Sequence, residues 1–293
     1  ADAPDPLAAR KIERWRSDRL ADPAARARNT AAPLALPFAQ AEAAGANEAA
    51  PLAGWTRAAF YSFMQGDADI YTVRADGTDI RNVTRHPAAD IDPSLSPDGE
   101  RVVFASDRDG NWELYTVRID GSDLLRLTYT PDTEVEPAWS PDGKRIAYAA
   151  RRAGLTHFAI RAMNADGSND RVISSGWDEG APAWSPDGER IAYMRYDAQA
   201  RGSVWIYNFS TGALNGVLGP MAFAGHPAWS PDGTMLALDF DSDNDVWNEI
   251  VTFDMTQPWW VKRVIADLSD PLIDLWMGAW SPDGSLVMFT AAW

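Results

Sequence analysis

The sequence contains no cysteine, which excludes disulfide bonds and thiol chemistry and leaves the compartment undefined by redox state. Histidine is scarce: the chain has only His86, His157 and His226, and their spacing matches no metal-binding motif. No uninterrupted apolar run is long enough to span a membrane, so no transmembrane segment is predicted. G-x-S-x-G, H-E-x-x-H and phosphate-binding glycine motifs are also missing. We therefore expect a protein that is not an enzyme.

Positive charge is in deficit, with 26 Lys and Arg against 42 Asp and Glu and a formal net charge of −16. The imbalance lies entirely in residues 55–293, which hold 19 basic and 35 acidic side chains, whereas residues 1–54 hold seven of each. Such an acidic body repels nucleic acid, so that class of partner is excluded. Basic or neutral protein partners are favoured instead.

The most informative pattern present is the tetrapeptide Ser-Pro-Asp-Gly, which occurs five times. Its copies start at Ser96, Ser140, Ser185, Ser230 and Ser281, at intervals of 44, 45, 45 and 51 residues. A period of about 40–45 residues is typical of a propeller blade, a small antiparallel sheet of four strands. The sequence therefore predicts an all-β propeller.

One repeat shows how the strands and turns of a blade are encoded. Residues 140–143 have the residue preferences of a type I turn, with proline second and glycine fourth. Alternating strands are expected at residues 145–148 and 158–160, followed by a hairpin at Asp166-Gly167 and a last strand at residues 171–173. Four short strands joined by tight turns make one blade.

The repeats read PAWSPDGKRIAY, PAWSPDGERIAY, PAWSPDGTMLAL and GAWSPDGSLVMF, with PSLSPDGERVVF as a divergent copy. This pattern resembles the TolB-type family of WD-repeat-like β-propellers over residues 55–293. The resemblance implies a six-bladed ring. Only five inner strands can be counted directly, so a five-bladed ring is the alternative. The resemblance also implies a bacterial, periplasmic or otherwise extracytoplasmic location. The ADAP start suits a signal-peptidase product, and equally a truncated chain.

Residues 1–54 differ from the repeat and are predicted to form an N-terminal arm, followed by the propeller at residues 55–293. Asp5-Pro6 is a typical helix start, so a short helix is expected at about residues 6–20. An extended connector rich in Ala and Pro follows. The helix has too few apolar residues to fold alone, so it packs either on its own propeller or on a neighbouring subunit. Its predicted partner-binding side chains are Ile12, Trp15, Arg16 and Arg19.

Tryptophan falls into two groups with different expected roles. One precedes each of four repeat turns, where repetition at equivalent positions predicts packing between blades; these are Trp139, Trp184, Trp229 and Trp280. The pair Trp259-Trp260 instead replaces the Asp-Gly turn of the other blades. It is either a contact hot spot for a partner or a cover for the longer fifth repeat.

Acidic residues recur at the start of the predicted inner strands, which would line the central channel. The predicted channel-mouth residues are Asp90, Asp92, Glu134, Glu136, Glu179 and His226. Clustered carboxylates would raise one another's pKa or attract a cation. One interpretation is a funnel that binds a metal ion, a basic peptide or an arginine. The other is a set of solvated loop acids in an acidic protein.

A possible calcium site lies at Asp241, Asp243 and Asp245, whose spacing can wrap a cation. The loop is not an EF-hand, because Val246 stands at its sixth position and Thr252 at its twelfth, where Gly and Glu belong. No cofactor other than this possible calcium is predicted.

The favoured hypothesis is a non-enzymatic interaction platform, an accessory or scaffolding subunit of a larger, membrane-associated assembly. It would have no transmembrane segment of its own and would dock through the arm and the Trp259-Trp260 edge. The alternative is a calcium-dependent, lactonase-like enzyme, or a propeller that binds a glycan or another ligand, through the carboxylates Asp90, Glu134 and Glu179.

Overall fold

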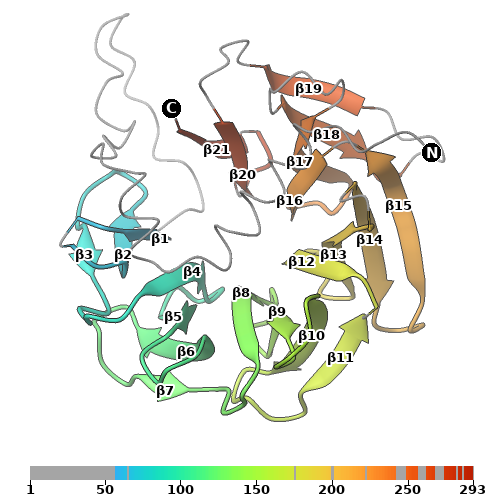
Figure 1. Cartoon of the computed structure of the whole chain (residues 1–293). Coiled ribbons are helices and arrows are strands. Elements are labelled where there is room, and N and C mark those ends of the chain that lie inside the picture. The colour runs from blue at the N-terminus through green and yellow to red at the C-terminus, as the bar shows by residue number, and fades with distance from the viewer. Residues whose placement is uncertain are drawn as a thin grey trace, which may run out of the picture.

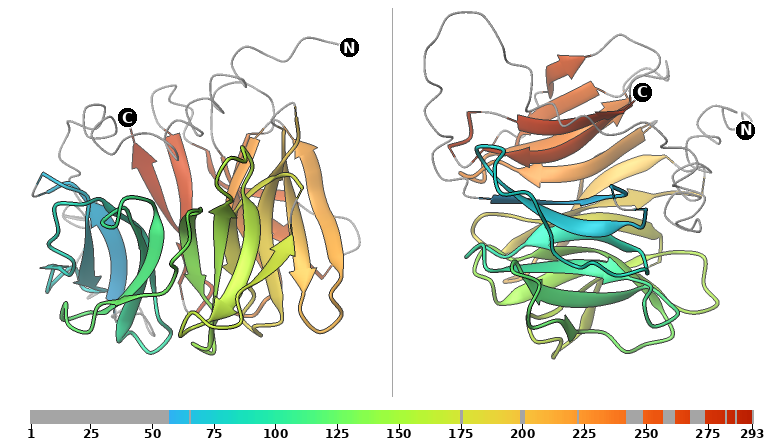
Figure 2. Two further views of the ribbon diagram at one scale, coloured as in Figure 1. Left: turned by 60° about the horizontal axis from the view of Figure 1, so that its bottom comes forward. Right: turned by 90° about the vertical axis from the view of Figure 1, so that its left-hand side faces the viewer.

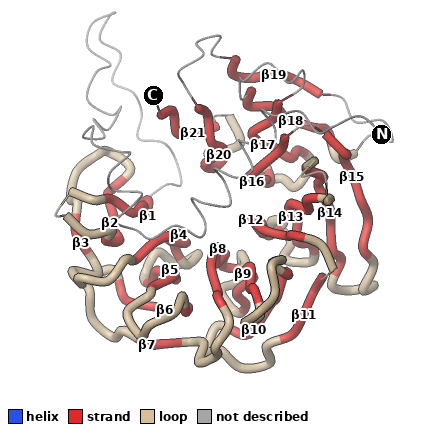
Figure 3. Tube along the Cα trace, in the orientation of Figure 1, coloured by secondary structure: helices blue, strands red, loops and turns tan. Residues whose placement is uncertain are grey.

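The structure is a computed structural model that describes residues 57–64, 66–174, 176–198, 201–221, 223–241, 249–256, 262–267, 274–281, 283–285 and 287–292. These residues form β-strands and loops, without a helix among them (Figure 3). Consequently the described part of the chain offers no helix that could cross a membrane. The predicted arm, with its short helix, lies outside the described residues.

The strands follow one another along the whole described chain. They are β1 (Arg57–Ser62), β2 (Asp69–Arg74), β3 (Arg81–Asn82), β4 (Asp90–Leu95), β5 (Arg101–Ser106), β6 (Glu113–Arg118), β7 (Leu125–Arg126), β8 (Thr133–Trp139), β9 (Arg145–Arg151), β10 (Ala159–Asn164), β11 (Arg171–Ser174), β12 (Asp178–Trp184), β13 (Arg190–Tyr196), β14 (Gly202–Asn208), β15 (Leu214–Met221), β16 (Phe223–Trp229), β17 (Met235–Asp241), β18 (Glu249–Asp254), β19 (Lys262–Asp267), β20 (Asp274–Trp280) and β21 (Val287–Ala292).

Each sheet is built from strands that are consecutive in the sequence and pair antiparallel. Four sheets have four strands (β4–β7, β8–β11, β12–β15 and β16–β19), one has three (β1–β3) and one has two (β20–β21). Figure 1 shows them arranged around a common centre, and the side views of Figure 2 show them stacked face against face. The predicted all-β propeller is confirmed.

The described strands form five blades, the alternative, and the six-bladed ring expected first is wrong. Five sheets contain an inner strand (β4, β8, β12, β16 and β20), and each of these counts as one blade; four of them have four strands and β20–β21 has two. The higher number came from the family resemblance. Strand β1 aligns with β5, the second strand of its blade, so β1–β3 contains no inner strand of its own.

The inner strands β4, β8, β12, β16 and β20 lie nearest the centre, and each packs against the next (Figure 1). The second strands β5, β9, β13 and β17 are buried along most of their length, because another sheet covers each of their faces. This explains the apolar I-A-Y pattern of the repeats: Phe104, Tyr148 and Tyr193 are fully buried at equivalent positions. The core therefore lies between the sheets.

The Ser-Pro-Asp-Gly turn is closed by its own side chains. The Ser140 hydroxyl donates to the Asp142 carboxylate at 2.6 Å and accepts from the Arg145 backbone N–H at 2.9 Å. The Gly143 N–H donates to the Ser140 carbonyl at 2.9 Å, with Gly143 at a φ of 69° that favours glycine. The same Ser-to-Asp bond recurs in the other four copies, which explains why this tetrapeptide repeats.

The tryptophans before the turns join neighbouring blades, as predicted. The Trp184 indole N–H donates to the Ala138 carbonyl of the preceding blade at 3.1 Å, and Trp280 does the same to Ala228 at 3.0 Å. The Arg145 guanidinium of the preceding blade lies 4.6 Å from the Trp184 ring centre. These contacts fix the inner strands relative to one another at the end opposite the predicted channel mouth.

Candidate functional site

Three predicted channel-mouth acids occupy one register position of their blades. Asp90, Glu134 and Glu179 lie at the start of β4, β8 and β12, opposite the last or the second-to-last residue of the second strand of each blade. All three are buried, with 0%, 2% and 0% of the residue surface exposed. They are therefore not solvated loop acids, and each must be neutralised or protonated inside its own blade.

Asp90 and Glu179 are neutralised by arginines. Arg108 forms two hydrogen bonds to the Asp90 carboxylate, of 2.9 and 3.0 Å. Arg195 lies 2.9 Å from the Glu179 carboxylate, which also accepts a 2.8 Å hydrogen bond from the Ser174 hydroxyl. Burial raises the pKa of both carboxyls, and these hydrogen bonds and positive charges oppose that rise. The partner arginines were not predicted from the sequence.

Glu134 forms no ion pair with an arginine among the described residues, and Ala150 lies opposite it, at the place that Arg195 takes opposite Glu179. Its Oε1 accepts from the Thr130 hydroxyl, and its buried Oε2 has no hydrogen-bond partner in the described part of the chain. Burial, assisted by the nearby negative charge of Glu113, raises the pKa of Glu134 to about 8. Glu113 is itself buried and binds Arg126 at 2.8 Å, so it is the neutralised member of this pair. Glu134 is consequently protonated near neutral pH.

The remaining predicted channel-mouth residues mark a repeated distortion of the inner strands. Asp92, Glu136 and His226 have positive φ values of 52°, 54° and 38°, and Ala181 has 51° at the same place in β12. In each case the strand register shifts there and a proline follows. Non-glycine residues rarely adopt this backbone, least of all before proline. The bulge therefore holds these half-buried side chains at equivalent positions of neighbouring inner strands.

Glu136 and His226 at the bulges contact the next blade and their own blade, respectively. The Glu136 carboxylate accepts a 2.7 Å hydrogen bond from the backbone N–H of Ala181 in the next blade. The His226 Nδ1 lies 3.1 Å from Asp239 in its own blade, and Asp239 is fully buried. A Cβ on Gly225 would overlap the Asp239 carboxylate, so glycine makes room for this pair. Asp239 was not predicted, although its signal is visible: β17 reads LALDF where the other blades have small or apolar residues.

The other predicted site residues lie mostly outside the described part of the chain. These are Ile12, Trp15, Arg16, Arg19, Asp243, Asp245, Trp259 and Trp260. Asp241 ends strand β17. Within the described ranges, no three His, Asp or Glu side chains gather in a way that could hold a metal ion. The calcium site and the docking role of the arm stay predictions.

With this geometry established, the family can be assigned. The family model of the TolB beta propeller domain matches residues 42–184 and 163–292, which together cover most of the chain. The chain belongs to the TolB beta-propeller family. A 41-residue stretch of this TolB-type propeller is 51% identical to the Protein TolB homolog of Chlorobium luteolum. That stretch is 14% of this chain and 9% of the relative.

Two solved TolB structures have the same fold as this TolB-type propeller. TolB from Acinetobacter baumannii superposes with a TM-score of 0.65 at 17% identity, over 81% of this chain and 64% of that one. A TolB protein from Agrobacterium tumefaciens gives 0.62 at 20% identity, over 73% and 74%. The chain thus spans less than two thirds of the first of these, and at such identities the likeness shows the fold alone.

Proposed function

We propose that this TolB-type propeller is a non-enzymatic platform for protein–protein interaction, an accessory subunit of a larger membrane-associated assembly outside the cytoplasm. Family membership supports the interaction role, and the resemblance to TolB propellers supports the location. The assembly would be reached through partners, with the arm and the Trp259-Trp260 edge as additional docking segments.

The observation that carries the proposal is the contrast between two sets of charges on the inner strands. The carboxyls of Asp90 and Glu179 are buried and occupied by arginines, so they are structural. Asp92 and Glu136, at the strained bulges, are only half buried. The same strained backbone conformation recurs in four blades, although it costs conformational energy. Strain of this kind is typical of residues that are held in place for recognition. In an acidic body, these positions suit a basic segment of a partner protein.

The test is quantitative capture of partners by the wild-type chain and by the double variant Asp92→Asn, Glu136→Gln. Both changes remove charge while keeping shape; Asn tolerates the positive φ, and Gln can still accept from Ala181. The matched control is Asp120→Asn, Glu100→Gln, which removes two exposed charges from loops away from the channel. We expect a partner that is retained at least tenfold less by the double variant and is unaffected by the control. Equal retention by both variants would overturn Asp92 and Glu136 as part of the binding surface.

Deletion of residues 1–30 tests the arm separately. If the arm docks on another subunit, the shortened chain keeps its thermal unfolding midpoint and loses the partner. If it packs on its own propeller, the midpoint falls. A shortened chain that keeps both its midpoint and its partners would refute any docking role for the arm.

A further inference from the structure

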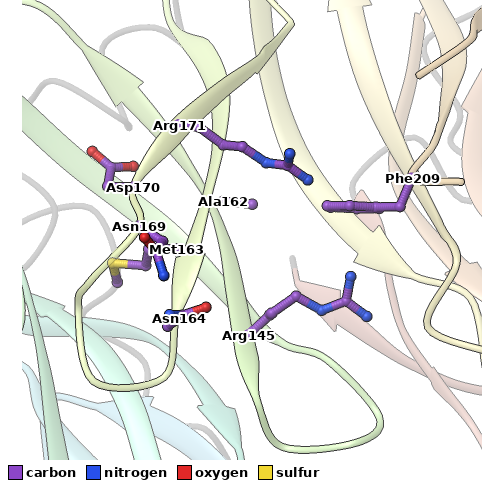
Figure 4. Close-up of a pocket in the computed structure, with 8 residues that line it drawn as sticks. All are labelled: Arg145, Ala162, Met163, Asn164, Asn169, Asp170, Arg171 and Phe209. Carbon is purple, nitrogen blue, oxygen red and sulfur yellow. The ribbon is translucent and has the colours of Figure 1, made fainter. Parts of the chain in front are cut away.

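A hollow of about 450 Å³ lies on the flank of the blade β8–β11, where it meets Phe209 at the end of β14 (Figure 4). Its lining residues are Arg145, Ala162, Met163, Asn164, Asn169, Asp170, Arg171 and Phe209. Arg145 begins β9 and Asn164 ends β10, so the hollow is at the Ser-Pro-Asp-Gly end of the blade. The channel-side acids lie at the other end of these strands, and the hollow is a separate feature with a volume in the usual range for small ligands.

The hollow is positively charged in a strongly acidic protein. The guanidinium groups of Arg145 and Arg171 lie 4.8 and 5.1 Å from the ring centre of Phe209, and Figure 4 shows both side chains directed towards that ring. Arg171 makes no ion pair with any described residue. Arg145 donates to the Gly188 carbonyl at 2.8 Å, and its nearest carboxylate, that of Asp142, is 3.9 Å away.

Asp170 also lines the hollow, but its carboxylate is already occupied. Arg161 binds it at 2.5 Å and the Tyr148 hydroxyl donates to it at 2.7 Å. Figure 4 shows the Asp170 side chain pointing away from Arg145 and Phe209. The two arginines of the hollow therefore lack the counter-charge that the adjacent aspartate would otherwise provide.

In the first sheet, β1–β3, an equivalent pair of arginines is neutralised by a carboxylate of the same sheet. Arg57 begins β1 and Arg81 begins β3, as Arg145 begins β9 and Arg171 begins β11. In that sheet a single carboxylate, Asp79, binds both arginines, at 2.5 and 2.6 Å. Asp79 thus neutralises the pair within one blade.

Equivalent positions in the next two blades have the same backbone conformation as Asp79, but only one of them has a carboxylate. Asp79 lies three residues after the aspartate of the Asp-Gly turn, with φ near 55°; the same place is taken by Asp123 (53°) and by Asn169 (54°). Asp123 binds Arg101 at 2.6 Å, as the pattern requires. In the third blade the neutral Asn169 stands there instead, so the arginine pair persists without its internal carboxylate.

We propose that the hollow binds a ligand through a carboxylate, which takes the role at Arg145 and Arg171 that Asp79 fills in the first sheet. Guanidinium groups bind carboxylates strongly and with defined geometry. The amides of Asn164 and Asn169 can donate further hydrogen bonds, and Ala162, Met163 and Phe209 offer apolar contact to the rest of the ligand. The ligand is a small polycarboxylate or an acidic side chain on a peptide. This inference is independent of the proposed function.

The test is calorimetric titration of the full chain with two probes, tricarballylate and a short peptide rich in aspartate, at 20 mM and 200 mM salt. Asn169→Asp rebuilds the internal carboxylate of the first sheet and should fold, because that geometry already exists in the same protein. We expect it to weaken binding about tenfold to a hundredfold, the effect of losing a hydrogen bond to a charged group. Arg171→Met should weaken binding similarly.

The matched control is Asn215→Asp, which adds the same charge at an exposed position of β15, in the neighbouring blade. It should change the affinity less than twofold. Binding of tricarballylate identifies a small polycarboxylate as the ligand class, and binding of the peptide alone identifies an acidic protein segment. Failure of both probes to bind the wild-type chain overturns the proposal, as does an Asn169→Asp variant that binds as tightly as the wild type.

Discussion

At the scale of single residues, the propeller handles buried charge differently from blade to blade. Asp90 and Glu179 each have an arginine, whereas Glu134 keeps a proton. All three occupy the same register position, so the difference comes from what the rest of the blade provides. The sequence reveals the recurrent acids, but the arginines that neutralise two of them lie 16 and 18 positions further along the chain, in or just after the second strand, which no local pattern encodes.

Glu134→Gln should change how stability depends on pH. The folded state holds the Glu134 proton up to about pH 8, whereas the unfolded chain releases it near its ordinary value of 4.5. The folded state therefore binds more protons in this window, and wild-type stability falls as pH rises through it. Glutamine cannot ionise, so the variant should lose less unfolding free energy between pH 5 and pH 8, by on the order of 3 kcal/mol. Denaturant unfolding at both pH values measures this.

The control for that experiment is Glu100→Gln, which alters an exposed carboxylate paired with Arg118. It should follow the wild-type pH curve. If Glu134→Gln follows it too, Glu134 is ionised in the folded protein and the assignment of a buried proton is wrong.

Arg108→Met should destabilise the chain by about 3–5 kcal/mol, because it leaves the fully buried Asp90 carboxylate without its counter-charge. Adding Asp90→Asn to that variant should recover part of the loss. By contrast, Arg118→Met breaks the exposed pair with Glu100 and should cost less than about 1 kcal/mol. Urea unfolding midpoints compare the three, and similar losses for Arg108→Met and Arg118→Met would count against a structural role for the buried pair.

At the scale of secondary-structure elements, the turns were predictable and the bulges were not. The Ser-Pro-Asp-Gly turn is closed by bonds among its own residues, as between Ser140 and Asp142, so its sequence is sufficient to identify it. The positive φ at Asp92 or Glu136 is different, because the residue types there (Asp, Glu, Ala, His) share no local property. That conformation is imposed by pairing with the second strand and by the neighbouring inner strand.

Ala181→Gly tests whether the bulge is strained. Alanine at φ 51° costs about 1–2 kcal/mol, and glycine removes most of that cost while adding some entropy to the unfolded chain. We expect the free energy of unfolding of Ala181→Gly to rise by about 0.5–1 kcal/mol. Ala183→Gly, two residues later in the same strand and without a positive φ, should instead destabilise by about 1 kcal/mol. Thermal unfolding midpoints of both variants test this. If Ala181→Gly lowers the midpoint as Ala183→Gly does, the bulge is not strained.

At the scale of the whole molecule, the repeat period determines the architecture, whereas the net charge affects the stability. The repeat period predicted the propeller correctly, because the spacing of the five turns reflects the size of one sheet. The family pattern implied six blades, whereas five described sheets contain an inner strand. The hollow beside Arg145 and Arg171 was also beyond prediction, since it is apparent only when corresponding positions of separate blades are compared in space.

The net charge of −16 should make stability depend on ionic strength. Repulsion among the excess carboxylates destabilises the compact state, and salt screens it over a Debye length that shortens from about 30 Å at 0.01 M to about 10 Å at 0.1 M. Raising sodium chloride from 10 to 300 mM should therefore raise the thermal midpoint by a few degrees. Sucrose of equal osmolality controls for effects unrelated to charge. A midpoint that is constant or falls with salt would show that local ion pairs outweigh the repulsion.

Every described sheet is a meander of strands that directly follow one another in the chain. A blade can therefore assemble as soon as some 40 residues have emerged from the ribosome, without waiting for distant sequence. The first sheet, β1–β3, packs against the inner strand β4 that is synthesised directly after it, so each new blade can add to the one before it.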